Sequence, residues 1–406
     1  MSIKDGKPSK EPQGHISFQT NQGDFLSTSS IPFFQRMDVS SIEKQIKEIE
    51  DEIFNTQKNK ATEHHIGKLK AKIARLKATI EKQKGSGGKG KGFSVKKTGD
   101  ATVGLIGLPS VGKSTLLNQL TDAESQVGSY EFTTLDVIPG MMKHNGANIQ
   151  ILDLPGIITG ASKGRGRGRE ILSAIRNVDL IVLMLDSEHL HTLPIMTKEL
   201  HDAGIRVNQS KPDVLITHTN QGGINIQTTV RQTHISNRTI KSIAGEYVTN
   251  ADIIIRENIT EDQLIDVFVQ NRIYLPAFVL LNKIDRLEEQ VLRNHIDDLR
   301  RKGWVVHPIS AKDTIGIDEL KDLMFSQLDL IRIYMKPQGK KPDYQEPLIL
   351  KKGDTIEDAC RVIHRDFARR FRFAHIWGSS AKYAGQKVGL NHQLEDEDIL
   401  TIIITH

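Results

Sequence analysis

A glycine-rich stretch has the residue types and the spacing of a phosphate-binding loop. It fits the pattern GxxxxGK[ST], follows an apolar run at 102–106 and precedes a segment, 115–121, that can begin a helix, which is the context this pattern requires. We expect its backbone N–H groups to surround phosphate oxygens, Lys113 to reach the β- and γ-phosphates, and Ser114 to bind Mg²⁺. The stretch consists of Gly107, Leu108, Pro109, Ser110, Val111, Gly112, Lys113 and Ser114.

A second candidate site follows a strand expected at 148–152. It consists of Asp153, Leu154, Pro155 and Gly156. The aspartate is suited to hold Mg²⁺, often through water, and the Gly156 N–H to contact a γ-phosphate. Alone, these four residues indicate only a turn after a strand. Their position 40 residues after Lys113, at a strand end, favours a nucleotide site in which Lys113, Asp153 and Gly156 serve catalysis.

A third motif has the residue types that recognise guanine. It consists of Asn282, Lys283, Ile284 and Asp285, directly after a strand expected at 277–281. A carboxylate at Asp285 can accept both N–H groups on the Watson–Crick edge of guanine. Adenine has a different edge, and such a site can reject analogues by factors of about 10⁴ or more. We expect the Lys283 stem to lie along the base and Asn282 to tie this loop to the phosphate loop.

A fourth motif, Ser310, Ala311 and Lys312, follows a strand expected at 305–309. The Ala311 N–H can contact the guanine O6. The third motif is a common tetrapeptide that alone could be a plain exposed loop, but the order of the four motifs along the chain, each after a strand, predicts a site for GTP or GDP. The same residues argue against the alternative of a metabolic ATP-dependent kinase.

The elements that position these motifs are those of an α/β protein. Apolar strands are expected at the four places above and at 180–185, and helical stretches alternate with several of them. This pattern predicts a mainly parallel sheet covered by helices. The chain between Asp153 and Asn282 is longer than a minimal GTPase needs, so residues 187–276 are expected to form an α/β insertion.

A basic segment precedes this α/β region. Residues 58–97 carry 13 lysines and arginines against two glutamates, although the net charge of the whole chain is only +5. Isoleucines and leucines recur at helical spacing over 42–53 and 66–80, which predicts two amphipathic helices in antiparallel contact. Such a segment indicates contact with a polyanion, with RNA ahead of a membrane, or else a solvated helix face.

Composition limits what the remaining parts of the chain can form. Residues 1–38 are polar and predict a disordered extension. Residues 333–406 predict a small β-rich domain with one main helix near 355–371. One cysteine, Cys360, excludes an internal disulfide and a multi-cysteine metal site. No apolar run reaches about 18 residues, and a reducing compartment, most simply the cytoplasm, fits best.

Several long strings resemble one GTPase family. The order GLPSVGKS, YEFTTLDVIPG, DLPGIITGASKGRGRGRE, NKID and SAK is similar to the OBG-type GTPases. TQKNKATEHHIGKLKAKIARLK, RIYMKPQGKKPDY and HIWGSSAK resemble, within them, the developmentally regulated GTP-binding proteins. GGIN, EYVTNADI and LEDED look closer to the first of the two eukaryotic paralogues. The resemblance covers about residues 40–405.

The resemblance implies a fold and further site residues. It implies a helical hairpin and linker (39–98), a P-loop GTPase domain (99–186 and 277–332), the α/β insertion and a C-terminal ubiquitin-like TGS domain. It also implies that Thr134 is a catalytic residue and a ligand of Mg²⁺. Its neighbours Phe132 and Thr133 would belong to the same switch segment. Physically, Gly128 and Gly140 would bracket a segment able to move.

One departure from Ras-like GTPases concerns hydrolysis. Ile157 stands where those enzymes place a glutamine that orients water, so intrinsic hydrolysis should be slow or assisted. K⁺ is a candidate, but related GTPases that use it most clearly carry Asn where this chain has Ser110. Three arginines of a glycine-rich stretch could supply charge instead, or contact RNA or a partner: Arg165, Arg167 and Arg169.

The resulting expectation is a cytoplasmic, Mg²⁺-dependent GTPase. The family implies association with the ribosome and its rRNA, a role in translation, and a dedicated regulatory protein of the family as partner; no membrane contact is expected. The alternative is a nucleotide-gated switch that binds RNA or the ribosome and hardly hydrolyses GTP.

Overall fold

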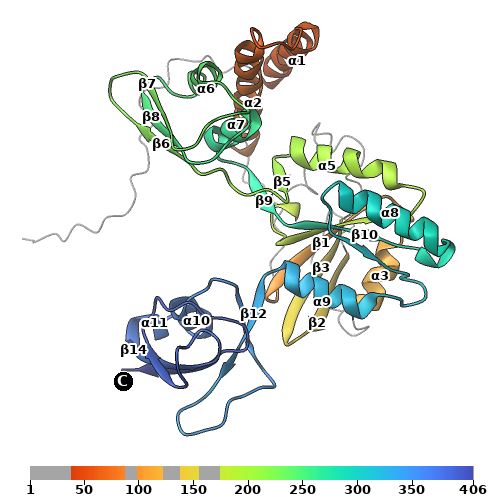
Figure 1. Cartoon of the computed structure of the whole chain (residues 1–406), viewed down its shortest axis with the longest axis vertical. Helices are drawn as coiled ribbons and strands as arrows, with labels where there is room; N and C mark the ends of the chain where they lie inside the picture. The colour runs from red at the N-terminus through yellow and green to blue at the C-terminus, as the bar shows by residue number, and fades with distance from the viewer. Residues whose placement is uncertain (1–37, 87–97, 122–137, 155–173, 406) are drawn as a thin grey trace, which may run out of the picture. The chain divides into compact units, whose positions relative to one another are not determined.

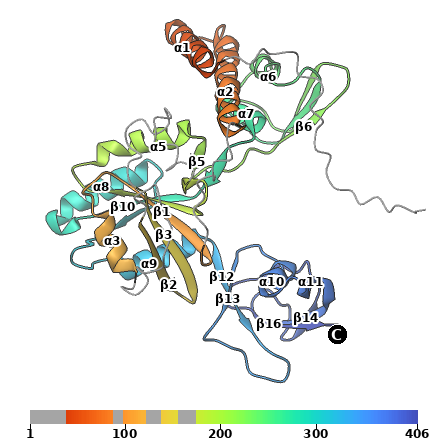
Figure 2. The same cartoon turned by 180° about the vertical axis from the view of Figure 1, so that it is seen from behind.

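The computed structural model describes residues 38–86, 98–121, 138–154 and 174–405 (Figures 1 and 2). The chain divides into two compact units, residues 1–55 and 56–406. The described part of the first unit is helix α1 (Val39–Asn55), which buries Ile42, Ile46 and Ile49 at helical spacing. The predicted extension lies outside the described residues except for Asp38, and the predicted pairing of α1 with a second helix stays a prediction.

The second unit begins with helix α2 (Glu63–Ser86), which carries most of the basic segment. Its turn before the helix is held by Asn59, whose Oδ1 accepts hydrogen bonds from the backbone N–H groups of Ala61 and Thr62 at 3.0 Å each. Ile66, Leu69 and Ala71 are buried. Both predicted helices are therefore present.

The second unit contains a six-stranded sheet. Its strand order is β11-β10-β4-β1-β3-β2, and all neighbours are parallel except β2 and β3. The register pairs Leu105 with Asp153 and Leu281 with Leu185, so the ends of the parallel strands meet at one edge. The strands are β1 (Ala101–Ile106), β2 (Ile138–His144), β3 (Ala147–Leu154), β4 (Leu180–Leu185), β10 (Ala277–Leu281) and β11 (Val306–Pro308).

Helices cover both faces of this sheet (Figures 1 and 2). On one face, α3 (Lys113–Leu120) and α9 (Ile317–Gln327) pack against side chains such as Val103 of β1. On the other, α5 (Leu193–Asp202) and α8 (Glu289–Arg301) pack against side chains such as Ile106. β1 is buried on both faces, which explains its unbroken apolar sequence.

The segment that has its own hydrophobic core is shorter at both ends than the insertion expected at 187–276. Helix α5, the preceding 3₁₀ turn η3 (Leu190–Thr192), β5 (Ile205–Val207) and β9 (Ile273–Leu275) contribute side chains to the core beside β4 and β10. β5 and β9 pair in parallel as a separate two-stranded sheet. The stretch with its own core thus starts after Val207 and ends before Ile273, because the amphipathic face of α5 is complementary to the large sheet.

The insertion itself is a three-stranded sheet with two helices on one face. The strands β6 (Val214–His218), β8 (Ala251–Ile255) and β7 (Ile224–Thr228) lie in that order, β6 antiparallel and β7 parallel to β8. The helices are α6 (Asn237–Ala244) and α7 (Glu261–Val269). Ala71 of α2 is buried in the same hydrophobic cluster, so this core includes part of the basic helix.

The C-terminal region is a five-stranded sheet packed on two short helices. Its order is β13-β12-β16-β14-β15. Its core includes Cys360, which is buried and unpaired, and burial raises the pKa of its thiol to about 11. The elements are β12 (Leu330–Met335), β13 (Leu348–Lys351), α10 (Ile356–Ile363), α11 (Phe367–Arg370), β14 (Phe371–Trp377), β15 (Gln386–Val388) and β16 (Ile399–Ile404). The single helix expected near 355–371 is therefore two helices.

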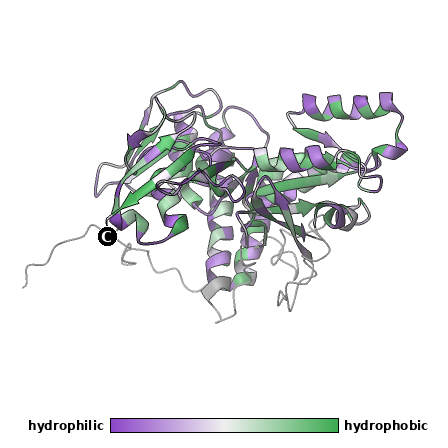
Figure 3. Cartoon of the chain, turned by 90° about the horizontal axis from the view of Figure 1, so that it is seen from below, coloured by the Kyte–Doolittle hydropathy of each residue, from purple (hydrophilic) through white to green (hydrophobic). Residues whose placement is uncertain are grey.

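Hydropathy follows this layering. Figure 3 shows the strands as mostly hydrophobic and many helices as alternating hydrophobic and hydrophilic bands, as expected where one helix face meets a sheet. Among the described residues, no helix combines the length and the apolar character needed to cross a membrane.

Candidate nucleotide site

The phosphate loop connects β1 to α3, as its sequence predicts. Gly112 caps the helix with φ of +100°, and a Cβ there would lie 2.4 Å from Nδ2 of Asn282. A Cβ at Gly107 would lie 2.5 Å from the carbonyl oxygen of Met184. Both positions therefore require glycine, one for its backbone conformation and both for the close approach of neighbouring groups.

Lys113 lies inside this loop. Its ammonium donates hydrogen bonds to the carbonyl oxygens of Gly107 and Leu108, each at 3.1 Å, and lies 3.9 Å from Oδ1 of Asp153. The side chain is 8% exposed, and this burial lowers the pKa of Lys113 against the opposing effect of Asp153. A cation held this way in a glycine-rich loop can neutralise phosphate oxygens.

Asp153 lies opposite the loop, in β3. Its Oδ2 accepts a hydrogen bond from Oγ of Ser114 at 3.2 Å. Its Oδ1 is buried and, among the residues that the structure describes, has no hydrogen-bond donor. Burial raises the pKa of Asp153, although Lys113 and the Ser114 hydrogen bond oppose that effect.

These donors fit a magnesium ion. A carboxylate oxygen and a hydroxyl oxygen are ligands that Mg²⁺ prefers, and a cation would compensate the incompletely paired Oδ1 of Asp153. Ser114 was predicted as a ligand and lies beside Asp153. Thr134, the other predicted ligand, lies outside the described residues.

Asn282 joins three loops at the edge of the sheet. Its side chain is buried; Nδ2 donates to the carbonyl oxygen of Val111 at 2.8 Å, and Oδ1 accepts from the backbone N–H of Ala311 at 2.9 Å. Its own backbone N–H donates to the carbonyl oxygen of Leu185 at 2.8 Å. The base loop is thereby fixed to the phosphate loop, as expected. The Ala311 N–H, which we expected to meet guanine O6, instead serves Asn282 here.

Asp285 is held by the fourth motif. Its Oδ1 accepts a hydrogen bond from Oγ of Ser310 at 2.7 Å, and this bond is the main cause of a lowered pKa for Asp285. The carboxylate is therefore ionised at neutral pH and can accept two N–H groups. Ser310 is itself buried and also approaches Asp313. Ile284 and Asp285 form a 3₁₀ turn, η4 (Ile284–Arg286).

One further residue at this edge of the six-stranded sheet, Asp186, was not predicted from the sequence. Asp186 directly follows β4, is buried, and accepts a hydrogen bond from Nζ of Lys283 at 2.8 Å. The signal was available: a lone carboxylate at the end of a fully apolar strand, beside other strand ends that carry motifs. Lys283 itself has φ of +64°, so it stands at a sharp turn.

Several predicted site residues lie outside the described residues: Phe132, Thr133, Thr134, Pro155 and Gly156, and with them Gly128, Ile157, Arg165, Arg167 and Arg169. Gly140, expected to bound a mobile segment, lies within β2. A Cβ there would lie 2.4 Å from Cγ2 of Thr121, the residue after α3, and 2.9 Å from Cδ1 of Leu117 in α3, so close packing against the end of α3 explains that glycine.

The basic helix α2 is partly neutralised by the insertion. Nζ of Lys70 lies 3.1 Å from Glu261 and 3.4 Å from Asp262, and Nζ of Lys68 lies 3.8 Å from Glu246. The hydroxyl of Tyr247 donates to the carbonyl oxygen of Ala71 at 2.9 Å. These lysines therefore attach α2 to the insertion, and the expected contact of the basic segment with a polyanion stays a prediction.

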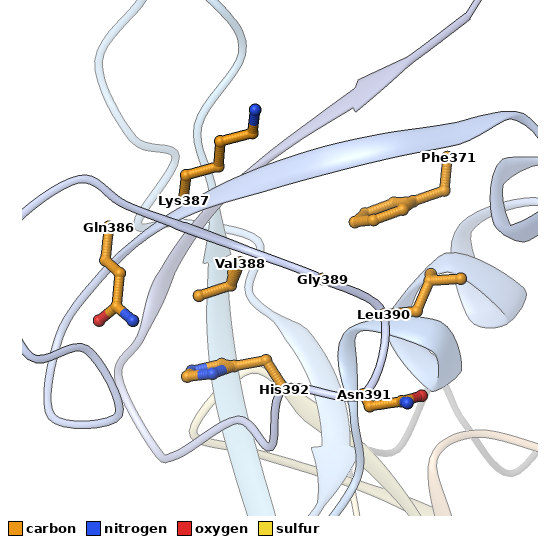
Figure 4. Close-up of a pocket in the computed structure, with 8 residues that line it drawn as sticks. All are labelled: Phe371, Gln386, Lys387, Val388, Gly389, Leu390, Asn391 and His392. Carbon is orange, nitrogen blue, oxygen red and sulfur yellow. The ribbon is translucent and has the colours of Figure 1, made fainter.

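A surface hollow in the C-terminal region is separate from these motifs (Figure 4). It contains none of the four nucleotide motifs, and no role follows from it. Its lining is Phe371, Gln386, Lys387, Val388, Gly389, Leu390, Asn391 and His392.

Comparison with known families agrees with this arrangement. A family described as "50S ribosome-binding GTPase" matches residues 102–219, and the C-terminal region of the same domain matches 221–330. A TGS domain matches residues 331–404. The five-stranded C-terminal sheet is therefore a TGS domain, as expected, and the six-stranded sheet belongs to a P-loop GTPase domain.

Two solved structures resemble the chain more distantly. A YchF GTPase of Schizosaccharomyces pombe aligns with a TM-score of 0.43 and 14% identity, covering 76% of this chain and 99% of that one. A GTP-binding protein of Pyrococcus horikoshii aligns with a TM-score of 0.41 and 14% identity, covering 75% and 100%.

Curated relatives are similar along nearly their whole length. An uncharacterized GTP-binding protein of Methanocaldococcus jannaschii is 52% identical over 368 residues, covering 90% of this chain and 94% of the relative. Developmentally-regulated G-protein 3 of Arabidopsis thaliana is 47% identical over 373 residues (90% and 99%), and human developmentally-regulated GTP-binding protein 2 is 45% identical over 363 residues (89% and 98%). The chain belongs to the family of developmentally regulated GTP-binding proteins.

Proposed function

We propose that the protein binds GTP with Mg²⁺ and hydrolyses it to GDP and phosphate. The observation that supports this proposal is the group of side chains at the ends of β1 and β3. It consists of the buried ammonium of Lys113, the hydroxyl of Ser114, and an Asp153 carboxylate of which one oxygen has no hydrogen bond from the described residues. The guanine specificity would come from Asp285, which Ser310 orients.

The chain's own residues suggest how the reaction would be supported. Lys113 would neutralise charge on the β- and γ-phosphates, while Ser114 and Asp153, with Thr134 by family resemblance, would hold the ion. Bound Mg²⁺ supplies charge compensation for the phosphates. Gly156 would sense the γ-phosphate through its N–H. Ile157 cannot orient water, so we propose slow intrinsic hydrolysis that a partner or a K⁺ ion accelerates.

We further propose that the protein acts with ribosomes in cytoplasmic translation. The support is the basic segment, in which Lys58 and Lys60 before α2 and Lys72 on α2 are exposed, together with the matched family's description as ribosome-binding. Basic side chains of this kind suit rRNA phosphates. A regulatory protein of this family is the proposed further partner.

A nucleotide-gated switch with negligible hydrolysis is the second candidate, and Ile157 is the observation that favours it. Single-turnover conversion of GTP, measured with and without ribosomes and in K⁺ or Na⁺ buffer, separates the two. We expect slow turnover that ribosomes accelerate. GTP binding without turnover under every condition would contradict the GTPase and support the nucleotide-gated switch. Absence of GTP binding would contradict both.

A further inference from the structure

A buried carboxylate next to the base loop has no part in the motifs described above. Asp186 follows β4 directly and is 2% exposed. Leu185 pairs with Leu281 in the neighbouring strand, and its carbonyl oxygen accepts the Asn282 N–H. Asp186 therefore stands beside the first residues of the loop that would contact guanine.

Both oxygens of this carboxylate are bound. Oδ2 accepts the hydrogen bond from Nζ of Lys283 at 2.8 Å, and Oδ1 lies 2.5 Å from Nδ1 of His189. Burial alone would raise the pKa of Asp186, but the hydrogen bonds from Lys283 and His189 outweigh it and lower the pKa. The group is therefore an ionised, fully paired buried carboxylate, which is stable only with such partners.

Lys283 is the partner that links Asp186 to the nucleotide. Its backbone is in the left-handed region, and its side chain is 26% exposed while its ammonium is held. A flexible four-carbon stem loses considerable conformational entropy when it must lie flat against a base. Fixing the ammonium at one end removes part of that loss before the nucleotide binds.

We propose that Asp186 is a positioning residue of the guanine-nucleotide site. It holds Nζ of Lys283 so that the methylenes of Lys283 form a preset surface for the face of the purine ring. His189 fixes the carboxylate from the other side, and the Thr192 N–H and hydroxyl hold the His189 carbonyl oxygen at 3.0 and 2.7 Å. This inference rests on the proposed guanine-nucleotide site.

The proposal assigns different effects to two carboxylates. Asp285 meets the edge of the base and decides which base binds. Asp186 acts through the ring face and should affect every purine equally. Loss of Asp186 should therefore lower the affinities for GDP and for xanthosine diphosphate by the same factor, whereas loss of Asp285 should change their ratio.

The test is an equilibrium titration of GDP and xanthosine diphosphate against the full chain and its variants. Asp186→Asn keeps the shape and removes the charge, and we expect about tenfold weaker GDP binding, the factor that corresponds to about 1.4 kcal/mol. Lys283→Met keeps the stem without the ammonium and should cost about the same. The double variant should bind no more weakly than Lys283→Met, because Asp186 acts through that ammonium.

Two further variants keep the test decisive. Lys283→Arg retains a cation within reach of Asp186 and should bind GDP more tightly than Lys283→Met; equal affinity would overturn the proposal even if Asp186→Asn does not fold. Asp266→Asn removes a different buried, paired carboxylate and should leave GDP affinity unchanged. Wild-type affinity of Asp186→Asn, or additive losses in the double variant, would also overturn it. Failure of the wild type to bind GDP would contradict the proposed function instead.

Discussion

Asp266 and Asp153 are both buried carboxylates with basic neighbours, but they differ in how completely their oxygens are hydrogen-bonded. Asp266 on α7 accepts hydrogen bonds from Nε and Nη2 of Arg206 at 2.5 and 2.7 Å and from Nε of Arg272 at 2.8 Å. Within the described part of the chain, Asp153 of the candidate nucleotide site accepts one hydrogen bond, from Ser114, and Nζ of Lys113 lies 3.9 Å away. Both carboxylates are nearly inaccessible to solvent.

The difference separates a structural ion pair from a binding site. The Arg206–Asp266 pair joins β5 to the insertion and needs no further ligand. Oδ1 of Asp153 is buried without a hydrogen bond from any residue that the structure describes, and burial raises the pKa of that carboxyl. Burial of a charge therefore does not indicate a ligand site by itself; the incomplete pairing of a buried charge does.

The largest expected effect is a loss of nucleotide affinity when the side chains next to Asp153 are removed. Lys113→Ala removes the phosphate-facing cation, and Ser114→Ala removes the hydroxyl beside Asp153. Each should weaken binding of GTP with Mg²⁺ by about 100-fold or more, since charge-assisted contacts to phosphate are lost. An equilibrium titration measures this. Wild-type affinity would mean that the loop is only a structural turn.

A second prediction for the same candidate site concerns its selectivity among bases. Asp285→Asn replaces an acceptor with an amide that can present a donor to the same edge of the base. We expect the preference for GTP over xanthosine triphosphate to fall by about 100-fold or more, while the unfolding temperature stays near that of the wild type. Competition between the two nucleotides measures the ratio, and an unchanged ratio would remove Asp285 from base recognition.

The described part of the basic segment, which comprises α2 and the turn before it, permits a test with a matched control. Lys58, Lys60 and Lys72 are exposed, whereas Lys68 and Lys70 pair with acidic residues of the insertion. Neutralising the first three should weaken ribosome co-sedimentation and flatten its salt dependence by a log–log slope of about 0.7 to 0.9 for each lost phosphate contact. GTP binding should persist. Equal pelleting at every salt concentration would exclude these lysines as the anchor.

The smallest of these effects concerns the paired lysines. Lys70→Gln should lower the free energy of unfolding by about 1 kcal/mol or less, because the Lys70 side chain is 37% exposed and such pairs are weak. Chemical denaturation measures this change. A loss of ribosome association without any loss of stability would show that Lys70 contacts the ribosome rather than Glu261.

The sequence predicted most of the fold because its signals were local. The strands expected at 180–185 and 277–281 have the predicted bounds, since each is an unbroken apolar run within its own segment. The position of α5 could not be predicted, because its packing on the large sheet depends on side chains distant in sequence. The burial of Ala71 in the insertion core could not be predicted for the same reason.

The candidate site was predicted in its motifs and less well in its contacts. Spacing alone led to the Asn282 link to the phosphate loop. Spacing could not show that Ala311 donates to Asn282 or that Asp186 binds Lys283, because those bonds depend on the register of neighbouring strands. Thr134 and Gly156 stay predictions.

The central claim is that, judged from the residues with a described structure, the hydrogen bonding of Asp153 is incomplete whereas that of Asp266 is complete. This claim predicts opposite changes in stability when each carboxylate is removed. A carboxyl whose pKa is raised in the folded state opposes folding when ionised, so this cost is present above its folded pKa and is relieved as pH falls toward its ordinary value of 3.8. Thermal unfolding of nucleotide-free, Mg²⁺-free protein at pH 7 is the direct measurement. Asp153→Asn should raise the unfolding temperature, by an amount that shrinks as the pH is lowered toward 4. Asp266→Asn should lower it, since breaking a buried pair strands Arg206. A lower unfolding temperature for both variants would contradict the account.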